Sequence, residues 1–74
     1  METAETKTIQ VVVNGQPRSV TGGLNVPGLL AFLEIEPSRV AIELNRQIVR
    51  KPDWEGTLIE AGAQIEIVWF VGGG

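Results

Sequence analysis

The last three residues of this sequence, Gly72, Gly73 and Gly74, are the ones best suited to covalent chemistry. The chain contains no cysteine and no histidine, so thiolate or imidazole nucleophiles, bases and metal ligands are excluded. Glycine has no Cβ, which lets a tail lie extended in a narrow channel and leaves the carboxylate of Gly74 unhindered. We therefore expect Gly74 to be the reacting residue, and Gly72 and Gly73 to thread into the active site of a partner.

A carboxylate becomes a good electrophile only after activation. Adenylation by ATP would turn the Gly74 carboxylate into an acyl-adenylate, and attack by a sulfur nucleophile would then leave a thiocarboxylate at the chain end. The sequence has no P-loop and no strand–GxGxxG–helix unit with which to hold ATP. We predict that the chain is not an enzyme and binds no cofactor, and that it is the substrate of a separate activating enzyme that uses ATP.

The first part of the chain predicts a β-hairpin. Residues 9–13 are β-branched and apolar apart from Gln10, which predicts a strand, and Asn14-Gly15 leads into a second strand over residues 16–21. Pro17 has no N–H to donate, so nothing pairs with the outer side of the second strand. That strand is expected at the edge of a sheet, with the first strand further inside.

One amphipathic helix follows. Val26, Leu29, Leu30 and Leu33 share the i, i+3, i+4, i+7 spacing of a single apolar stripe. Pro37 is expected to mark the end of this helix, because the residue before a proline rarely remains helical.

Three further strands are predicted over residues 40–44, 47–50 and 64–70. A single helix can cover only one face of a sheet, so these elements predict a two-layer α+β domain. A chain of 74 residues is long enough for one domain. We expect residues 1–7 to form a flexible leader and residues 71–74 a flexible tail.

Charge and hydropathy argue against two classes of partner. The six basic residues are scattered along the sequence and outnumbered by nine acidic ones, whereas nucleic-acid binding needs a basic stripe. No apolar run approaches the roughly 20 residues that cross a membrane, and the first residues lack the pattern of a signal peptide. The expectation is a cytoplasmic protein that binds neither nucleic acid nor membrane.

Residues 8–74 resemble the ThiS family, the sulfur carriers of thiamine biosynthesis. The most specific segments are residues 40–45 (VAIELN), residues 47–50 (QIVR), Trp54 and residues 68–74 (VWFVGGG). The resemblance implies a ubiquitin-like β-grasp fold with one mixed sheet. It implies adenylation of Gly74 by an E1-like enzyme of the ThiF type, sulfur from a persulfide donor, and delivery to a thiazole synthase of the ThiG type. Asn45-Arg46 departs from the Asn-Gly that relatives often carry at this turn.

A docking surface follows from alternation in the last strand. Ile65 and Ile67 are expected to face the core, which places Val68 and Phe70 on the opposite face. In a β-grasp sheet the first strand lies beside the last, and Val12 points to that same face. The prediction is an apolar patch of Val12, Val68 and Phe70 that docks the activating enzyme.

Three other functions remain open at this stage. A sulfur carrier for molybdopterin synthesis or tRNA thiolation would use the same Gly74 chemistry. A ubiquitin-like modifier would form isopeptide bonds through Gly74. A β-grasp binding module would do no covalent chemistry and would not need a free terminus.

Overall fold

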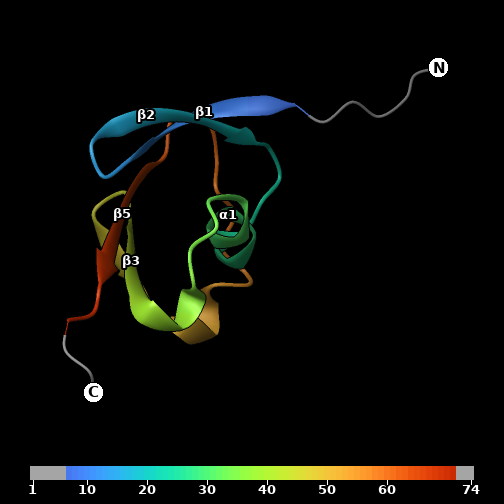
Figure 1. The fold of residues 1–74 in the computed structure, drawn as a ribbon. Coiled ribbons are helices and arrows are strands. Elements are labelled where there is room, and N and C mark those ends of the chain that lie inside the picture. The colour runs from blue at the N-terminus through green and yellow to red at the C-terminus, as the bar shows by residue number, and fades with distance from the viewer. Residues whose placement is uncertain (1–6, 72–74) are drawn as a thin grey trace.

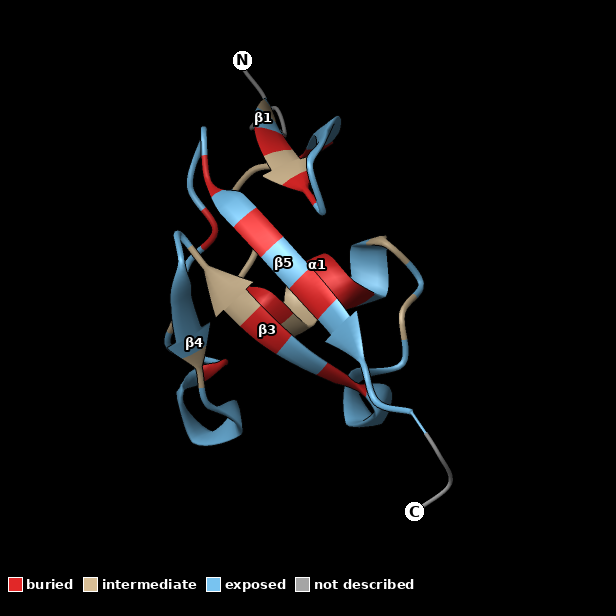
Figure 2. Cartoon of the chain, turned by 90° about the vertical axis from the view of Figure 1, so that its left-hand side faces the viewer, coloured by how far each residue is buried: buried red, intermediate tan, exposed pale blue. Residues whose placement is uncertain are grey.

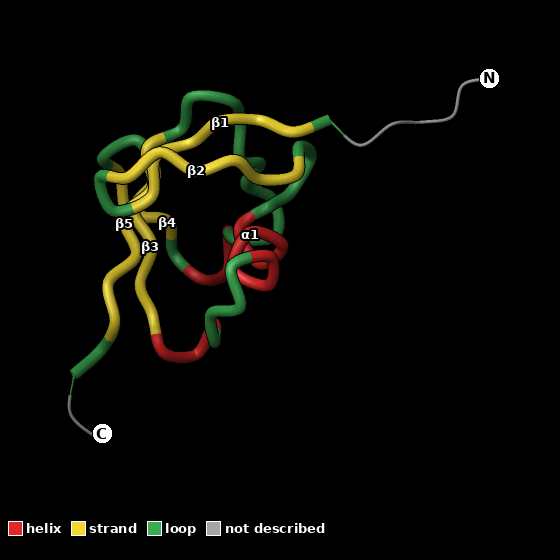
Figure 3. The backbone as a smooth tube through the Cα atoms, turned by 45° about the horizontal axis from the view of Figure 1, so that its top comes forward, coloured by secondary structure: helices red, strands yellow, loops and turns green. Residues whose placement is uncertain are grey.

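The structure, a computed structural model, describes residues 7–71. The predicted leader and tail lie outside the described residues except for Lys7 and Val71, which have no regular secondary structure. One sheet wraps around one side of helix α1 (Figure 1). The same two layers are visible in the backbone trace, where the helix lies below β1 and β2 and to one side of β3, β4 and β5 (Figure 3). This is the α+β arrangement that the hydrophobic pattern predicts.

The first hairpin forms in the register expected for a two-residue loop. β1 (Thr8–Val13) pairs antiparallel with β2 (Gln16–Thr21). Asn14 and Gly15 have φ values of 51° and 81°, the left-handed values that such a tight turn needs. β2 lies at the edge of the sheet, whose order is β2-β1-β5-β3-β4. The position of Pro17 therefore predicted the edge correctly.

The remaining strands complete a mixed five-stranded sheet. β5 (Gln64–Trp69) lies in the centre, parallel to β1 and antiparallel to β3 (Val40–Leu44). β3 continues through a second tight turn into β4 (Gln47–Val49), the other edge strand. Asn45 and Arg46 in that turn have φ values of 51° and 72°. The arginine therefore occupies a backbone conformation that favours glycine.

Helix α1 (Val26–Phe32) begins at the first residue of the predicted apolar stripe. The Asn25 side chain caps it by accepting a hydrogen bond from the Gly28 N–H at 2.9 Å. Among the described residues, no helix has the length and apolar composition needed to cross a membrane. The side of α1 that faces the sheet buries Val26, Leu29 and Leu30.

The helix ends well before Pro37, so that expectation was wrong. Glu34 adopts a left-handed φ of 62°. The Glu34 N–H donates to Ala31 O at 3.1 Å and the Ile35 N–H donates to Leu30 O at 2.9 Å. This pair of bonds is a Schellman cap, which satisfies the last carbonyls and turns the chain away. The cap usually carries glycine at the position of Glu34, and for that reason the sequence did not reveal it.

Two 3₁₀ turns, η1 (Pro37–Arg39) and η2 (Lys51–Asp53), lead into β3 and out of β4. Trp54, directly after η2, is 5% exposed and donates its Nε1–H to Val49 O at 2.8 Å. Its buried, hydrogen-bonded indole is a packing element rather than an open platform for a ligand.

A single core lies between α1 and the sheet. It takes residues from the strands and helix and also Ile59 and Ala63, which belong to the long segment before β5 and have no periodic signal in the sequence. The buried apolar residues are Val11, Val13, Val20, Val26, Leu29, Leu30, Val40, Ile42, Trp54, Ile59, Ala63, Ile65 and Ile67.

Asn14 does more than make the first turn. Its side chain accepts from the Ile67 N–H at 2.7 Å and donates to Ile67 O at 3.3 Å. The side-chain amide thus takes the place of a strand residue at the point where β1 has ended and β5 continues. Asn45 in the other turn makes one such hydrogen bond to β5 instead of two: its Oδ1 accepts from the Gln64 N–H at 2.9 Å.

Replacing Asn14 by glycine is expected to destabilise the domain by about 1–3 kcal/mol. Glycine keeps the left-handed backbone but leaves both polar groups of Ile67 without their partner. Asn45→Gly is the matched control, because it keeps the same turn geometry and removes one bond instead of two. Chemical denaturation of the two variants measures the difference. An equal or larger loss for Asn45→Gly would contradict the importance of the Asn14 contact.

Candidate functional site

β5 is the strand that carries the chain toward its predicted reactive end. Ile65 and Ile67 are 1% and 4% exposed, whereas Glu66 between them is exposed. Figure 2 shows this alternation as red and pale-blue bands along β5. The facing of the strand is therefore the one predicted. β5 is paired with β3 along its length, and on its other side it is held by β1 and the Asn14 side chain as far as Ile67. It is therefore a firm support for the residues that follow.

Four consecutive apolar side chains are exposed where β5 ends. Val68, Trp69, Phe70 and Val71 are 54%, 47%, 61% and 93% exposed. The predicted exposure of Val68 and Phe70 is confirmed. A run of large exposed apolar residues is costly to keep in water and typically marks a surface that a partner covers.

Trp69 is an exposed residue that sequence reasoning missed. Strict alternation places it on the inner face with Ile67, yet it is about half exposed. The reason is the early end of α1, which leaves only the partly buried Leu33 and Ile35 near this part of the sheet. No local pattern in the sequence shows where a helix stops covering the strand beneath it.

Val12 does not join Val68 and Phe70, so the predicted three-residue patch is not formed. Val12 lies beside Gln64 in the parallel β1–β5 pair and is only partly exposed. Val68 is four residues further along β5, about 13 Å away at the usual rise per residue. Polar Gln64 and Glu66 occupy the same face in between.

The structure places other apolar residues beside Val68 and Phe70 instead. Ala41 pairs with Val68 across β3 and β5, and one hollow of about 400 Å³ is lined by Ala41, Ile48 and Phe70 among others. Ile48 in β4 is 73% exposed. These side chains lie on the face of the sheet away from α1. The outer-face patch is defined here as Ala41, Ile48, Val68 and Phe70.

Basic residues border this patch, although the chain as a whole carries a net charge of −3. Arg50 and Lys51 line the same hollow as Phe70 and Ile48. Arg46 lines the neighbouring hollow together with Glu43, Glu66 and Val68. The three basic groups come from one short stretch around β4, and they outnumber the two carboxylates that line the hollows. The local charge therefore suits an acidic partner surface better than the net charge suggests.

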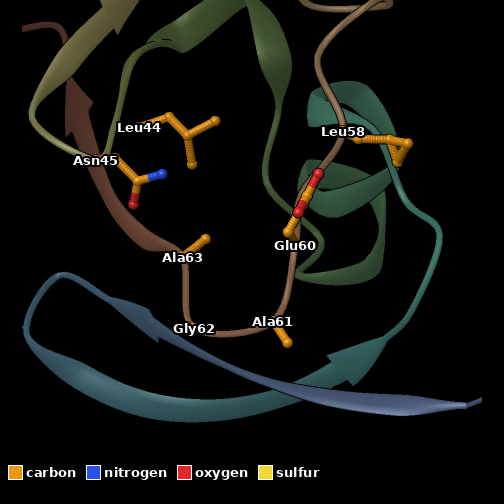
Figure 4. Close-up of a pocket in the computed structure, with 7 residues that line it drawn as sticks. All are labelled: Leu44, Asn45, Leu58, Glu60, Ala61, Gly62 and Ala63. Atoms are coloured by element: carbon orange, nitrogen blue, oxygen red, sulfur yellow. The ribbon is translucent and has the colours of Figure 1, made fainter.

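Another hollow, of about 270 Å³, lies at the opposite end of β5 (Figure 4). Its walls come from the turn after β3 and from the segment that leads into β5. Glu60 is the one ionisable side chain among its lining residues, so it lacks the paired groups that acid–base chemistry uses. The residues that line it are Leu44, Asn45, Leu58, Glu60, Ala61, Gly62 and Ala63.

Gly72, Gly73 and Gly74 lie outside the described residues, so their roles rest on comparison with other proteins. Residues 11–74 match the sequence model described as the ThiS family. The chain belongs to the ThiS family. The crystal structure of the thiamine biosynthesis protein ThiS from Geobacter metallireducens matches with a TM-score of 0.78 and 33% identity, over 89% of this chain and 100% of that chain. The β-grasp fold expected of a ubiquitin-like sulfur carrier is therefore confirmed.

The curated relatives of this ThiS-family chain include a sulfur carrier and two thiazole synthases. The sulfur carrier protein ThiS of Escherichia coli is 29% identical over 66 residues, which cover 89% of this chain and all of that one. The thiazole synthases of Magnetococcus marinus and Paramagnetospirillum magneticum are 33% and 35% identical over 66 residues. The chain spans only 20% of the length of each thiazole synthase.

Proposed function

We propose that this chain is a sulfur carrier for thiazole formation in thiamine biosynthesis and carries the sulfur as a thiocarboxylate on Gly74. The observation that supports this most is the family match, which extends through Gly74. The fold agrees with it, because the central strand leads straight from the core into the glycine tail. The ThiS match favours the thiamine pathway over the molybdopterin and tRNA alternatives.

The chemistry takes place in the active sites of partners. The Gly74 carboxylate attacks the α-phosphate of ATP, and pyrophosphate leaves. A persulfide sulfur then displaces AMP from the acyl-adenylate, and a thiol cleaves the resulting acyl disulfide to leave the thiocarboxylate. In this proposal Gly72 and Gly73 fill the narrow channel that brings Gly74 to the nucleotide, since side chains there would widen it.

The activating enzyme, of the E1-like ThiF type, docks on the outer-face patch. This patch is apolar and exposed, and its residue Phe70 directly precedes the tail. The nearby Arg50 and Lys51 call for acidic groups beside an apolar centre on the enzyme, whereas Arg46 lies among the carboxylates of Glu43 and Glu66. Val12 has no part in this interface, because polar residues separate it from the patch.

Thiazole synthase, of the ThiG type, is the proposed acceptor of the sulfur. Two bacterial thiazole synthases contain a stretch similar to nearly the whole of this chain. A carrier domain within the same polypeptide as the enzyme is what a direct sulfur transfer between the two would favour.

Intact mass spectrometry tests the proposed function. The chain is incubated with ATP, the activating enzyme and a persulfide donor. The expected product has one oxygen replaced by sulfur, and fragmentation places the change on Gly74. Isopeptide-linked conjugates in place of this product would support the protein-modifier alternative and contradict a sulfur carrier.

A further inference from the structure

The backbone of β5 directs its polar groups alternately to the strands on either side. The backbone N–H and C=O groups of the even-numbered β5 residues point toward β3. The Phe70 N–H donates to Arg39 O at 2.9 Å, and Gln64 O accepts from the Asn45 N–H at 2.7 Å. This edge of β5 is paired along the whole strand.

The backbone groups of the odd-numbered β5 residues point toward β1. The pairing of β5 with β1 stops before the end of β5. Ile65 O accepts from the Asn14 N–H at 2.8 Å, and the Asn14 side chain serves both polar groups of Ile67. By the same alternation, the N–H and C=O of Trp69 point to this side. No described strand runs alongside Trp69 there, since β1 ends at Val13. The end of β5 therefore has one open edge.

A groove with both polar and apolar lining lies next to this open edge, on the α1 side of the sheet. It has a volume of about 290 Å³, and its apolar residues include Leu33, Ile35 and Trp69. Asn14 in the first turn and Gln16 and Arg18 from β2 form its polar side, and Arg18 is the one charged residue that lines it. The edge groove is defined here as these residues together with the open edge of Trp69.

We propose that the edge groove binds an extended segment of thiazole synthase. The segment adds a strand beside Trp69 and exchanges backbone hydrogen bonds with it. It places an apolar side chain over Leu33 and Ile35 and an acidic side chain against Arg18. Strand addition at an open edge is a common mode of peptide recognition, in which the backbone supplies affinity and the side-chain pockets supply specificity. This inference rests on the proposed function.

Two observations favour thiazole synthase as the occupant. First, this enzyme appears among the proteins similar to the chain, as a polypeptide that contains a ThiS-like stretch. Second, the open edge continues directly into Val71 and the tail, which the acceptor enzyme must hold extended to receive sulfur. The outer-face patch, proposed for the activating enzyme, is on the opposite face of the sheet. The two partners thus recognise the tail from different sides.

A backbone ester at Trp69 tests the strand addition. Replacing the tryptophan by its α-hydroxy acid removes one N–H and keeps the side chain. The affinity of the full-length chain for thiazole synthase is expected to fall about three- to tenfold, the worth of one backbone hydrogen bond. Pyrophosphate release by the activating enzyme is expected to stay within about twofold of the unmodified chain, since a twofold change corresponds to less than one such bond.

The control is the same ester at Ile48. The odd-numbered residues of β3 direct their backbone groups to β5, so its even-numbered residues direct theirs to β4. Ile48 lies opposite the odd-numbered Glu43, and its N–H therefore points to the open outer edge of β4. Its removal is expected to leave the affinity for thiazole synthase unchanged. An unchanged affinity for the Trp69 ester, or a loss confined to adenylation, would overturn the edge assignment. If the unmodified chain failed to bind thiazole synthase, the proposed function would fall with it.

Charge reversal gives a second test. Arg18→Glu is expected to weaken binding to thiazole synthase about tenfold, with a smaller effect at high salt. Lys7→Glu makes the same charge change at the open end of the first hairpin, far from the groove along β1, and is expected to have little effect. Equal losses for the two variants would mean that net charge, rather than the edge groove, controls binding, and would overturn the assignment.

Discussion

Removing Gly74, or adding one residue after it, is expected to abolish ATP-dependent pyrophosphate release. In-line attack on the α-phosphate needs the carboxylate within near-contact distance, and both changes move it by a whole residue. A misplacement of about 1 Å can already cost 100-fold, so we expect a loss of at least about 100-fold in kcat/KM. The measurement is pyrophosphate release with the activating enzyme at saturating ATP.

The domain itself is expected to be unaffected by either change, because the core and the whole of β5 lie before the tail. Thermal melts of the variants should match that of the unmodified chain within experimental error. One residue added before Met1 serves as the control for chain length. Pyrophosphate release that survived the loss of Gly74 would show that another group is adenylated, and the thiocarboxylate proposal would be wrong.

Local signals predicted the parts of the fold that neighbouring residues decide. Asn14-Gly15 established the first hairpin and its register, and Pro17 identified an edge strand. The alternation around Glu66 correctly set the inner face of β5. Each of these features depends on backbone conformation or side-chain spacing within a few residues, which a single sequence records directly.

Features that depend on the offset between distant segments were not predictable in this way. Alternation places Val12 and Val68 on one face, but it cannot show how far β1 and β5 slide along each other. The parallel pair sets Val12 beside Gln64, and this offset removes Val12 from the patch. Ile48 reaches the patch only because β3 pairs with β5 on one side and with β4 on the other.

The exposure of Trp69 has the same kind of origin. It follows from a Schellman cap at Glu34, where the usual glycine signal is missing, and from the resulting early end of α1. A residue counted as core by its position in the strand is therefore left at the surface. The candidate site is larger than the sequence predicts, because exposed apolar side chains lie on both faces of β5: Val68 and Phe70 on one, Trp69 on the other.

Truncating Ile67 and truncating Phe70 are expected to have opposite effects. Ile67 is 4% exposed in the core, so Ile67→Ala should cost about 2–5 kcal/mol of stability through lost packing and a cavity. Phe70 is 61% exposed, so Phe70→Ala should change stability by less than about 1 kcal/mol. Denaturant unfolding measures both values.

The effects of the two variants on activation by the enzyme should have the opposite order, with Phe70→Ala the more harmful. A large aromatic side chain at the centre of an interface typically contributes about 1–2 kcal/mol or more, so Phe70→Ala should lower kcat/KM for pyrophosphate release about tenfold. Ile67→Ala should leave it nearly unchanged below its melting temperature, because it does not face the enzyme. Phe32→Ala is the matched control: Phe32 is 46% exposed on α1, away from the outer-face patch. If Phe32→Ala impaired activation as much as Phe70→Ala, the activating enzyme would not be docking on the outer face, and the patch would lose its proposed role.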